Sequence, residues 1–194
     1  MCSSDLTPGS RLAQRYSAVR ERTASLIQSL RPEDTVVQSM PDVSPTKWHL
    51  AHVTWFFERF VLEPHVTGYR RFSEDYDFLF NSYYYTAGEM HARPRRGLLS
   101  RPSLSEILDY RARIDDAMLQ LLDKPLTEDV VFATTIGLNH EQQHQELLLT
   151  DIKHVFSCNP TSPAVMHDLK TSTSAEVGAY TYITGESGVR AIGA

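Results

Sequence analysis

The sequence predicts an all-α protein whose main unit is a four-helix bundle. Three observations support this class: four long segments have apolar residues at helical spacing, capping residues and prolines bound them, and one long connection separates the second from the third. A chain of 194 residues with 41% hydrophobic content can bury one substantial core. We expect a flexible terminus over residues 1–9, the bundle over 10–160, a linker over 161–179 and a short unit over 180–194.

The first two helices have clear limits. Apolar residues recur at helical spacing between residues 11 and 30, and a proline follows. Ser44 is a good N-cap and Pro45 suits the first helical position, so a second helix should start there and run to Leu62, where Pro64 stops it. This second helix is aromatic and apolar on more than one side, which predicts that it is largely buried.

Residues 65–101 form the long crossover of the predicted bundle. They combine many tyrosines and arginines with scattered glycines. A connection of this length is usually functional or disordered, and the density of tyrosine argues against disorder. We expect a short helix near residues 77–85 and a loop over the mouth of the bundle, with arginines available for a substrate carboxylate. The alternative is an aromatic minicore with solvated arginines.

The last two helices and the tail complete the prediction. Ser103 and Glu106 form a capping box for a helix that ends near Asp123, and Thr127 can cap a final helix that ends near Phe156. In the tail, two short β-prone runs separated by a glycine-containing turn predict a hairpin between residue 180 and the end of the chain. An isolated hairpin is marginal in water, so we interpret it as the opening of a domain whose remainder is absent.

Two histidines one turn apart in the final helix give the strongest chemical signal. His140 and His144 lie on one helical face with their Cβ atoms roughly 5–6 Å apart, close enough to bind one metal ion. In the second helix, His52 aligns with the inner face and is the expected third ligand, whereas His49 is expected to be structural or to support a ligand. The final helix carries these histidines on a heptad-like seam predicted to face the bundle interior, which consists of Val130, Ala133, Gly137, His140, His144, Leu147, Asp151 and His154.

Nearby polar residues are assigned by helical geometry. Asp151 and His154 lie about 10–15 Å along the axis from His144, too far to share its ion. Glu146 points almost opposite to His144 and is interpreted as a partner of a ligand or of another helix. A histidine in a protein core is often only a hydrogen-bonded structural residue. A cluster of three histidines, however, favours a metal-binding role.

The final helix also contains a metalloprotease pattern. His140, Glu141 and His144 fit H-E-x-x-H, in which the glutamate would serve as the catalytic base. The longer zincin pattern requires glycine at position 147 and histidine at position 150, where this chain has Leu147 and Thr150. A protease is therefore disfavoured.

Composition excludes several function classes. The net charge is −5 and no basic run is present, so nucleic acid is not an expected partner. No apolar stretch approaches the length of a membrane span, and the polar start lacks a signal-peptide layout, so we expect a cytoplasmic protein without a membrane partner. The two cysteines, Cys2 and Cys158, suggest neither a disulfide framework nor a cysteine-ligated zinc site.

Four motifs stand out along the chain: SPTKWHLAH at 44–52, FNSYY at 80–84, RPRRG at 93–97 and an H-x-x-x-H-x-E element that opens the segment 140–154. Together they closely resemble the amino-terminal half of the bacterial ergothioneine-biosynthesis sulfoxide synthases. The resemblance extends over roughly residues 10–165. In that family this half is a DinB-like four-helix bundle that donates three histidines to a mononuclear non-haem Fe(II), and a formylglycine-generating-enzyme-like domain follows.

The resemblance implies an iron(II)-dependent, O2-using enzyme. Such an enzyme joins the sulfur of cysteine or γ-glutamylcysteine to the imidazole of hercynine and oxidises the sulfur. By position, His52, His140 and His144 correspond to the iron ligands. Three neutral imidazoles leave about three positions open on the iron, which suits a thiolate, a substrate imidazole and O2.

The resemblance also implies roles for residues around the metal. Tyr83 and Tyr84 would line the site and are the candidate catalytic residues. Gln143 would face the trimethylammonium group of hercynine. Arg95 and Arg96 are weaker candidates for binding the carboxylate of the thiol co-substrate.

The family's carboxy-terminal domain supplies a catalytic tyrosine and most substrate contacts, and residues 180–194 resemble only its opening. We therefore expect the chain to be the metal-binding half, which needs the missing domain or a partner chain that supplies it. Two alternatives stay open: a DinB-like metal-dependent thiol transferase that uses zinc or nickel, and a non-catalytic metal-binding module that docks on a separate chain.

Overall fold

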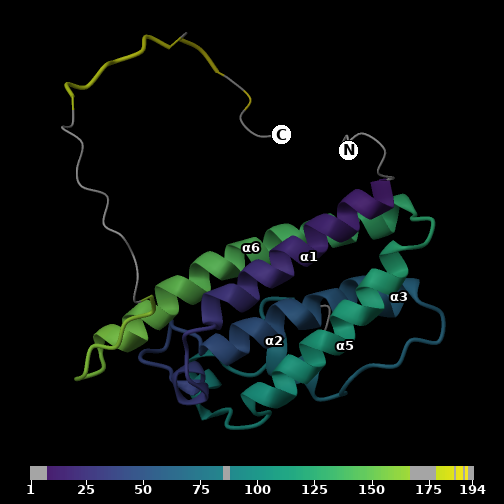
Figure 1. Ribbon diagram of the computed structural model, residues 1–194, viewed down its shortest axis with the longest axis horizontal. Coiled ribbons are helices and arrows are strands. Elements are labelled where there is room, and N and C mark those ends of the chain that lie inside the picture. Colours follow the sequence, from purple (N-terminus) through teal and green to yellow (C-terminus); the bar gives the residue numbers. More distant parts are fainter. Residues whose placement is uncertain (1–7, 85–87, 167–177, 186, 190, 192–194) are drawn as a thin grey trace.

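The fold is a helical bundle, seen in a computed structural model that describes residues 8–84, 88–166, 178–185, 187–189 and 191. Four long helices dominate, α1 (Pro8–Ile27), α2 (Thr46–Phe57), α5 (Leu104–Leu122) and α6 (Glu128–Ser157). Figure 1 shows α1 beside α6 in one layer and α2 beside α5 in another, and α2 also packs against α6. No strand occurs among the described residues, so the all-α prediction is confirmed.

Capping side chains set the first residues of the last two long helices, as predicted. The Ser103 hydroxyl accepts the Glu106 backbone N–H, and the Glu106 carboxylate accepts the Ser103 backbone N–H, which completes the capping box of α5. The Thr127 hydroxyl accepts the Val130 N–H at the start of α6.

None of the described helices combines the length and the apolar character needed to cross a membrane.

The second helix extends past its predicted stop. After Phe57 the chain forms a π-helical turn, η2 (Glu58–Leu62), and then the short α3 (Glu63–His65). Pro64 therefore lies inside the continued helix, directly after the π-helical turn, and does not end it. The buried Glu58 carboxylate accepts the hydroxyls of Tyr69 and Tyr110, which ties this turn to the crossover and to α5.

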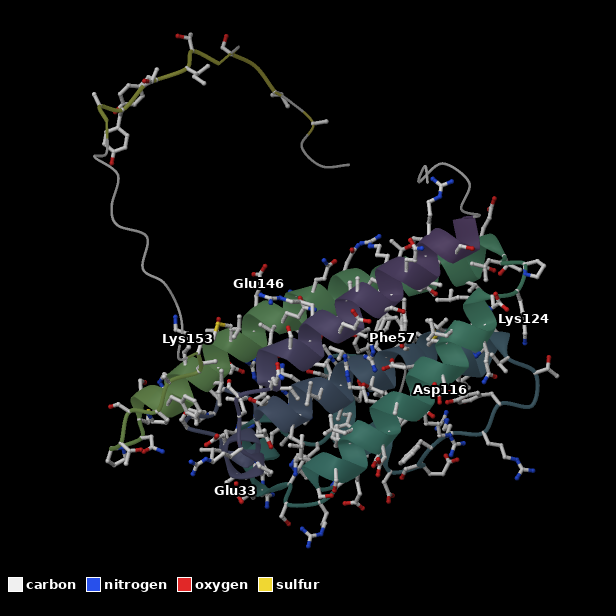
Figure 2. All side chains as sticks on the ribbon, in the orientation of Figure 1. Glu33, Phe57, Asp116, Lys124, Glu146 and Lys153 are labelled. Carbon is white, nitrogen blue, oxygen red and sulfur yellow. The ribbon has the colours of Figure 1, made fainter. Side chains whose placement is uncertain are left out.

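The bundle core forms around α2, all 12 residues of which are buried. Gly137 of α6 allows the closest approach, because a Cβ atom at this position would lie 2.5 Å from Cε1 of Phe57. Figure 2 shows Phe57 enclosed between the helices. This contact brings α6 close to α2 one turn before His140.

The crossover runs from the end of α3 back along the bundle to the start of α5 (Figure 1). It contains α4 (Tyr76–Phe80), which replaces the short helix expected near residues 77–85, and the 3₁₀ helix η4 (Arg93–Leu98). Residues 85–87 lie outside the described residues. Buried Lys47 donates from Nζ to the carbonyls of Leu99 and Pro102, at 2.8 and 2.7 Å, and so fixes the returning end of the crossover to α2.

The predicted carboxy-terminal hairpin is not confirmed. The described residues 178–185, 187–189 and 191 contain no strand, and their side chains are exposed. Part of the expected second run, residues 190 and 192, lies outside the described residues.

Candidate metal centre

Three histidines from two helices converge on one point. His52 comes from α2, and His140 and His144 come from α6; one ring nitrogen of each lies within 4.8 Å of the others. Nε2 of His52 is 3.2 Å from Nε2 of His140. A metal ion bonded to two nitrogens at about 2.1 Å holds them roughly 3.0–3.4 Å apart. The structure therefore brings together the three histidines that the sequence singled out, in an arrangement that fits a metal ion.

The His52 ring is held in one orientation. Its Nδ1 lies 2.6 Å from the carbonyl oxygen of Phe80, which can only accept, so Nδ1 carries the ring proton and Nε2 carries the lone pair. The indole of Trp48 stacks on the ring with centroids 4.6 Å apart, and its Nε1–H donates to the Leu79 carbonyl. The end of α4 thus directs the lone pair of His52 toward the other two histidines.

The partners of His140 and His144 differ. Nδ1 of His144 lies 2.9 Å from Nδ1 of His49, and Nε2 of His49 lies 3.0 Å from Oδ2 of Asp151. Nδ1 of His140 is buried and has no hydrogen-bond partner among the described residues. As helical geometry predicted, Asp151 is not one of the three clustered groups, and neither is His154, which contacts Ser39.

All three imidazoles are neutral near pH 7. Burial lowers the pKa of His140 to about 4. Burial, followed by repulsion from His49 and His140, lowers the pKa of His144 to about 2. Burial and the neighbouring histidines also place the pKa of His52 well below its ordinary value. Lone pairs are therefore available for a metal without prior loss of protons.

These shifts predict that acid destabilises the metal-free fold. The pKa of His140 is about 4 in the folded state and 6.5 ordinarily, so between these values the unfolded chain binds more protons. The free energy of unfolding should fall as the pH drops from 6.5 toward 4. Urea unfolding in the presence of a chelator should show this fall, and the His140→Gln/His144→Gln variant should show a smaller one. Identical pH dependence in both proteins would contradict the prediction.

A cavity of about 270 Å³ lies against the histidine cluster. The sequence-predicted residues Tyr83, Tyr84, Gln143 and Arg96 line it. Arg95 is exposed and is not among the lining residues. The remaining lining residues come from the two helices that carry the clustered histidines, from the residue Ser44 before α2 and from the crossover: Ser44, Trp48, His49, His52, Ser82, Arg93, His140, His144, Leu147 and Asp151.

Arg96 places a positive charge in the cavity wall. Its guanidinium carbon lies 3.3 Å from the centroid of the Trp48 ring, and its terminal nitrogens donate to the hydroxyls of Ser44 and Ser82 at 2.9 and 3.0 Å. Burial and the neighbouring Arg93 lower the pKa of Arg96 to about 9. No carboxylate is among its described hydrogen-bond partners, and its buried Nε has none. A buried cation with neutral partners favours an anionic ligand.

Sequence reasoning missed Arg93. In a 3₁₀ helix, residues three apart lie on the same side, so Arg93 joins Arg96 at the cavity while Arg95 faces solvent. Arg93 also donates to the hydroxyl of Tyr83 at 3.3 Å and to the carbonyl of Asp42. The sequence did contain a signal for this pairing: Arg93 and Arg96 are three residues apart, and Pro94 suits the first turn of a helix. The prediction of a loop over these residues did not use it.

The predicted seam of α6 is only partly buried. Val130 and Gly137 are buried, whereas Leu147 is 40% exposed. Other deeply buried residues of α6 lie beside the seam: Thr134, Leu138, Glu141, Leu148 and Ile152. His140 and His144 consequently lie at the edge of the core, where the cavity reaches them.

Two glutamates of α6 occupy positions that the motifs do not suggest. Glu141 is fully buried and its carboxylate pairs with Arg20 and Arg111, so it is not placed as the base of an H-E-x-x-H protease. Glu146 is exposed and projects from the outer surface of α6 (Figure 2), so the interpretation of Glu146 as a partner of a ligand or another helix is wrong.

Comparison with known proteins gives one family. Residues 15–148 match the family described as the DinB superfamily. This span includes all three clustered histidines and most of the helical bundle. A comparison with curated proteins finds no match.

Proposed function

The chain belongs to the DinB superfamily, and from this we propose that it is the metal-binding half of an iron(II)-dependent, O2-using sulfoxide synthase. The reaction would join the sulfur of cysteine or γ-glutamylcysteine to the imidazole of hercynine. The observation that carries the proposal is the cluster of three neutral histidines beside a cavity with a buried arginine in its wall. The motif resemblance supplies the choice of iron and of hercynine.

In this proposal His52, His140 and His144 hold Fe(II). The bound iron would supply Lewis acidity toward a thiolate and redox chemistry with O2. The protein's contribution is to present neutral nitrogens from two rigid helices and to leave the remaining side of the site open to the cavity.

The cavity residues would bind and orient the two organic substrates. Gln143 lies one residue before His144 in the cavity lining and is proposed to face the trimethylammonium group of hercynine. The ring of Tyr84 packs beside His52 and His140, where an aromatic face would also suit a cation. Burial raises the pKa of Tyr84, so its hydroxyl stays protonated at neutral pH and can hold a proton for a bound group. Tyr83, exposed at the rim, is the second candidate catalytic hydroxyl.

The thiol co-substrate would be held through its carboxylate. Arg96 is the proposed main contact because it is buried in the cavity wall without a carboxylate partner among the described residues. Arg93 would assist, whereas exposed Arg95 would contribute only by long-range attraction. A formylglycine-generating-enzyme-like domain, in the same protein or in a partner chain, is proposed to complete the substrate contacts beyond the exposed ring of Tyr83.

Calorimetric titration of the Fe(II)-loaded protein with cysteine and with γ-glutamylcysteine, under anaerobic conditions, tests this assignment. Arg96→Met should weaken binding of the effective thiol roughly 10- to 100-fold, because a charge-assisted hydrogen bond is lost. Arg95→Met is the matched control and should leave affinity nearly unchanged. Equal affinity in wild type and Arg96→Met, at equal metal content, would contradict the role of Arg96.

The same cluster would suit a zinc-dependent thiol transferase, since three imidazoles with an open position also describe a catalytic zinc site. Measurement of oxygen consumption distinguishes the sulfoxide synthase from the thiol transferase. The sulfoxide synthase should take up O2 only when thiol and hercynine are both present, in the presence of the completing domain. A thiol transferase should consume its thiol without O2 uptake.

A further inference from the structure

His49 occupies a position between a carboxylate and a metal-site histidine. Its Nε2 lies 3.0 Å from Oδ2 of Asp151, and its Nδ1 lies 2.9 Å from Nδ1 of His144. The backbone N–H of Ser44 also donates to Oδ2 of Asp151, at 2.8 Å, which fixes the carboxylate at the start of α2. The His49 ring is 3% exposed, so water does not compete for these contacts.

The direction of each hydrogen bond follows from the chemistry of its two ends. The Asp151 carboxylate can only accept, so Nε2 of His49 must carry a proton. A neutral imidazole carries a single ring proton, so with that proton on Nε2 the Nδ1 of His49 is an acceptor. Nδ1 of His144 must then be the donor. This leaves the lone pair of His144 on Nε2.

We propose that Asp151 and His49 form a hydrogen-bonded relay that fixes the tautomer of His144 and keeps its Nε2 available to a metal. Both are positioning residues, and this inference rests on the proposed metal centre. The relay has a simpler counterpart in His52, whose Nδ1–H donates directly to the Phe80 carbonyl. In both His52 and His144, a partner that accepts the proton of Nδ1 leaves the lone pair on Nε2, where it can bind a metal.

The relay also connects the two helices that carry the ligands. His49 lies on α2 one turn before His52, and Asp151 lies on α6 two turns after His144. A single chain of hydrogen bonds therefore runs from α6 to α2 and back to α6. It sets the separation of the helices at the point where their histidines must meet.

Two variants distinguish a relay from simple packing. His49→Gln keeps an acceptor for His144 and a donor for Asp151. His49→Phe/Asp151→Leu fills the space with apolar groups and leaves no unpaired carboxylate. If the relay operates, affinity for Zn(II), used as a redox-inert probe in a chelator competition, should fall roughly 10- to 100-fold in the double variant and only severalfold in His49→Gln. A larger loss of Zn(II) affinity in His49→Gln than in the double variant would show that His49 and Asp151 act only by filling space, and it would overturn the proposal.

The protonation pattern is measured separately, on the metal-free protein. Long-range ¹H–¹⁵N correlation spectra should show the Nδ1–H tautomer of His144 in the wild type and in His49→Gln, and the Nε2–H tautomer in the double variant. A wild-type Nε2–H tautomer, or an unchanged tautomer in the double variant, would overturn the relay. Because this readout needs no metal, failure of the wild type to bind any ion would refute the proposed function while leaving the tautomer result decisive for the relay.

Discussion

Replacing Glu141 with alanine is expected to lower the free energy of unfolding by about 3–5 kcal/mol, because it leaves two buried guanidinium groups without their shared partner. Glu141 is fully buried. Its Oε1 accepts from Arg111 and from the Thr23 hydroxyl, both at 2.6 Å, and its Oε2 accepts from Arg20 at 2.9 Å. Burial opposes the negative charge, but the two arginines outweigh it and lower the pKa of Glu141 to about 2.

The cost is large because this network links all four long helices. Arg20 and Thr23 lie on α1, Arg111 on α5 and Glu141 on α6, and both arginines also contact the hydroxyl of Thr54 on α2. Arg20 is 4% and Arg111 5% exposed, so water cannot replace the lost carboxylate without opening the core.

Urea unfolding of the metal-free protein measures the effect of the Glu141 substitution. Glu146→Ala is the matched control, since it removes the same side chain from an exposed position of the same helix and should change stability by less than about 0.5 kcal/mol. Equal stability of the two variants would show that the buried network contributes little. It would also reopen a chemical role for Glu141.

The Glu141 network shows why part of the site was not predictable from sequence. Its partners Arg20 and Arg111 are 121 and 30 residues away, so nothing in the local sequence marks a glutamate in α6 as the most buried position of its turn. Helical spacing located the pair His140 and His144. It did not determine which of two adjacent faces of α6 the other helices cover, and Leu147 was placed on the wrong one.

Features controlled by local chemistry were predicted well. The capping residues Ser103 and Thr127 placed the starts of α5 and α6, because their side chains satisfy backbone N–H groups a few residues away. The irregular segments were harder to predict. The π-helical turn after Phe57 is stabilised by distant partners of Glu58, and the pairing of Arg93 with Arg96 depends on a 3₁₀ helix that has no strong sequence signal.

Removal of the clustered histidines is expected to give the largest functional effect. Wild-type protein loaded anaerobically should contain about one Fe(II) per chain, and His140→Ala/His144→Ala should contain almost none. Four-ligand structural sites bind zinc with about 10–16 kcal/mol, or roughly 3 kcal/mol per ligand, so each lost imidazole should weaken binding by more than about 100-fold. His52→Ala should behave like a single α6 substitution, because it removes the nitrogen 3.2 Å from His140.

The control for metal analysis is His154→Ala on the same helix. His154 contacts Ser39 rather than the cluster, so its loss should leave the Fe(II) content unchanged. Urea unfolding of each metal-free variant separates lost ligands from a lost fold, and a folded His140→Ala/His144→Ala protein that still holds one Fe(II) would refute the ligand assignment. A folded His52→Ala protein with unchanged affinity would instead restrict the site to α6. Because α2 and α6 approach closely at Gly137, one turn before His140, histidines of both helices are placed to contribute to one site.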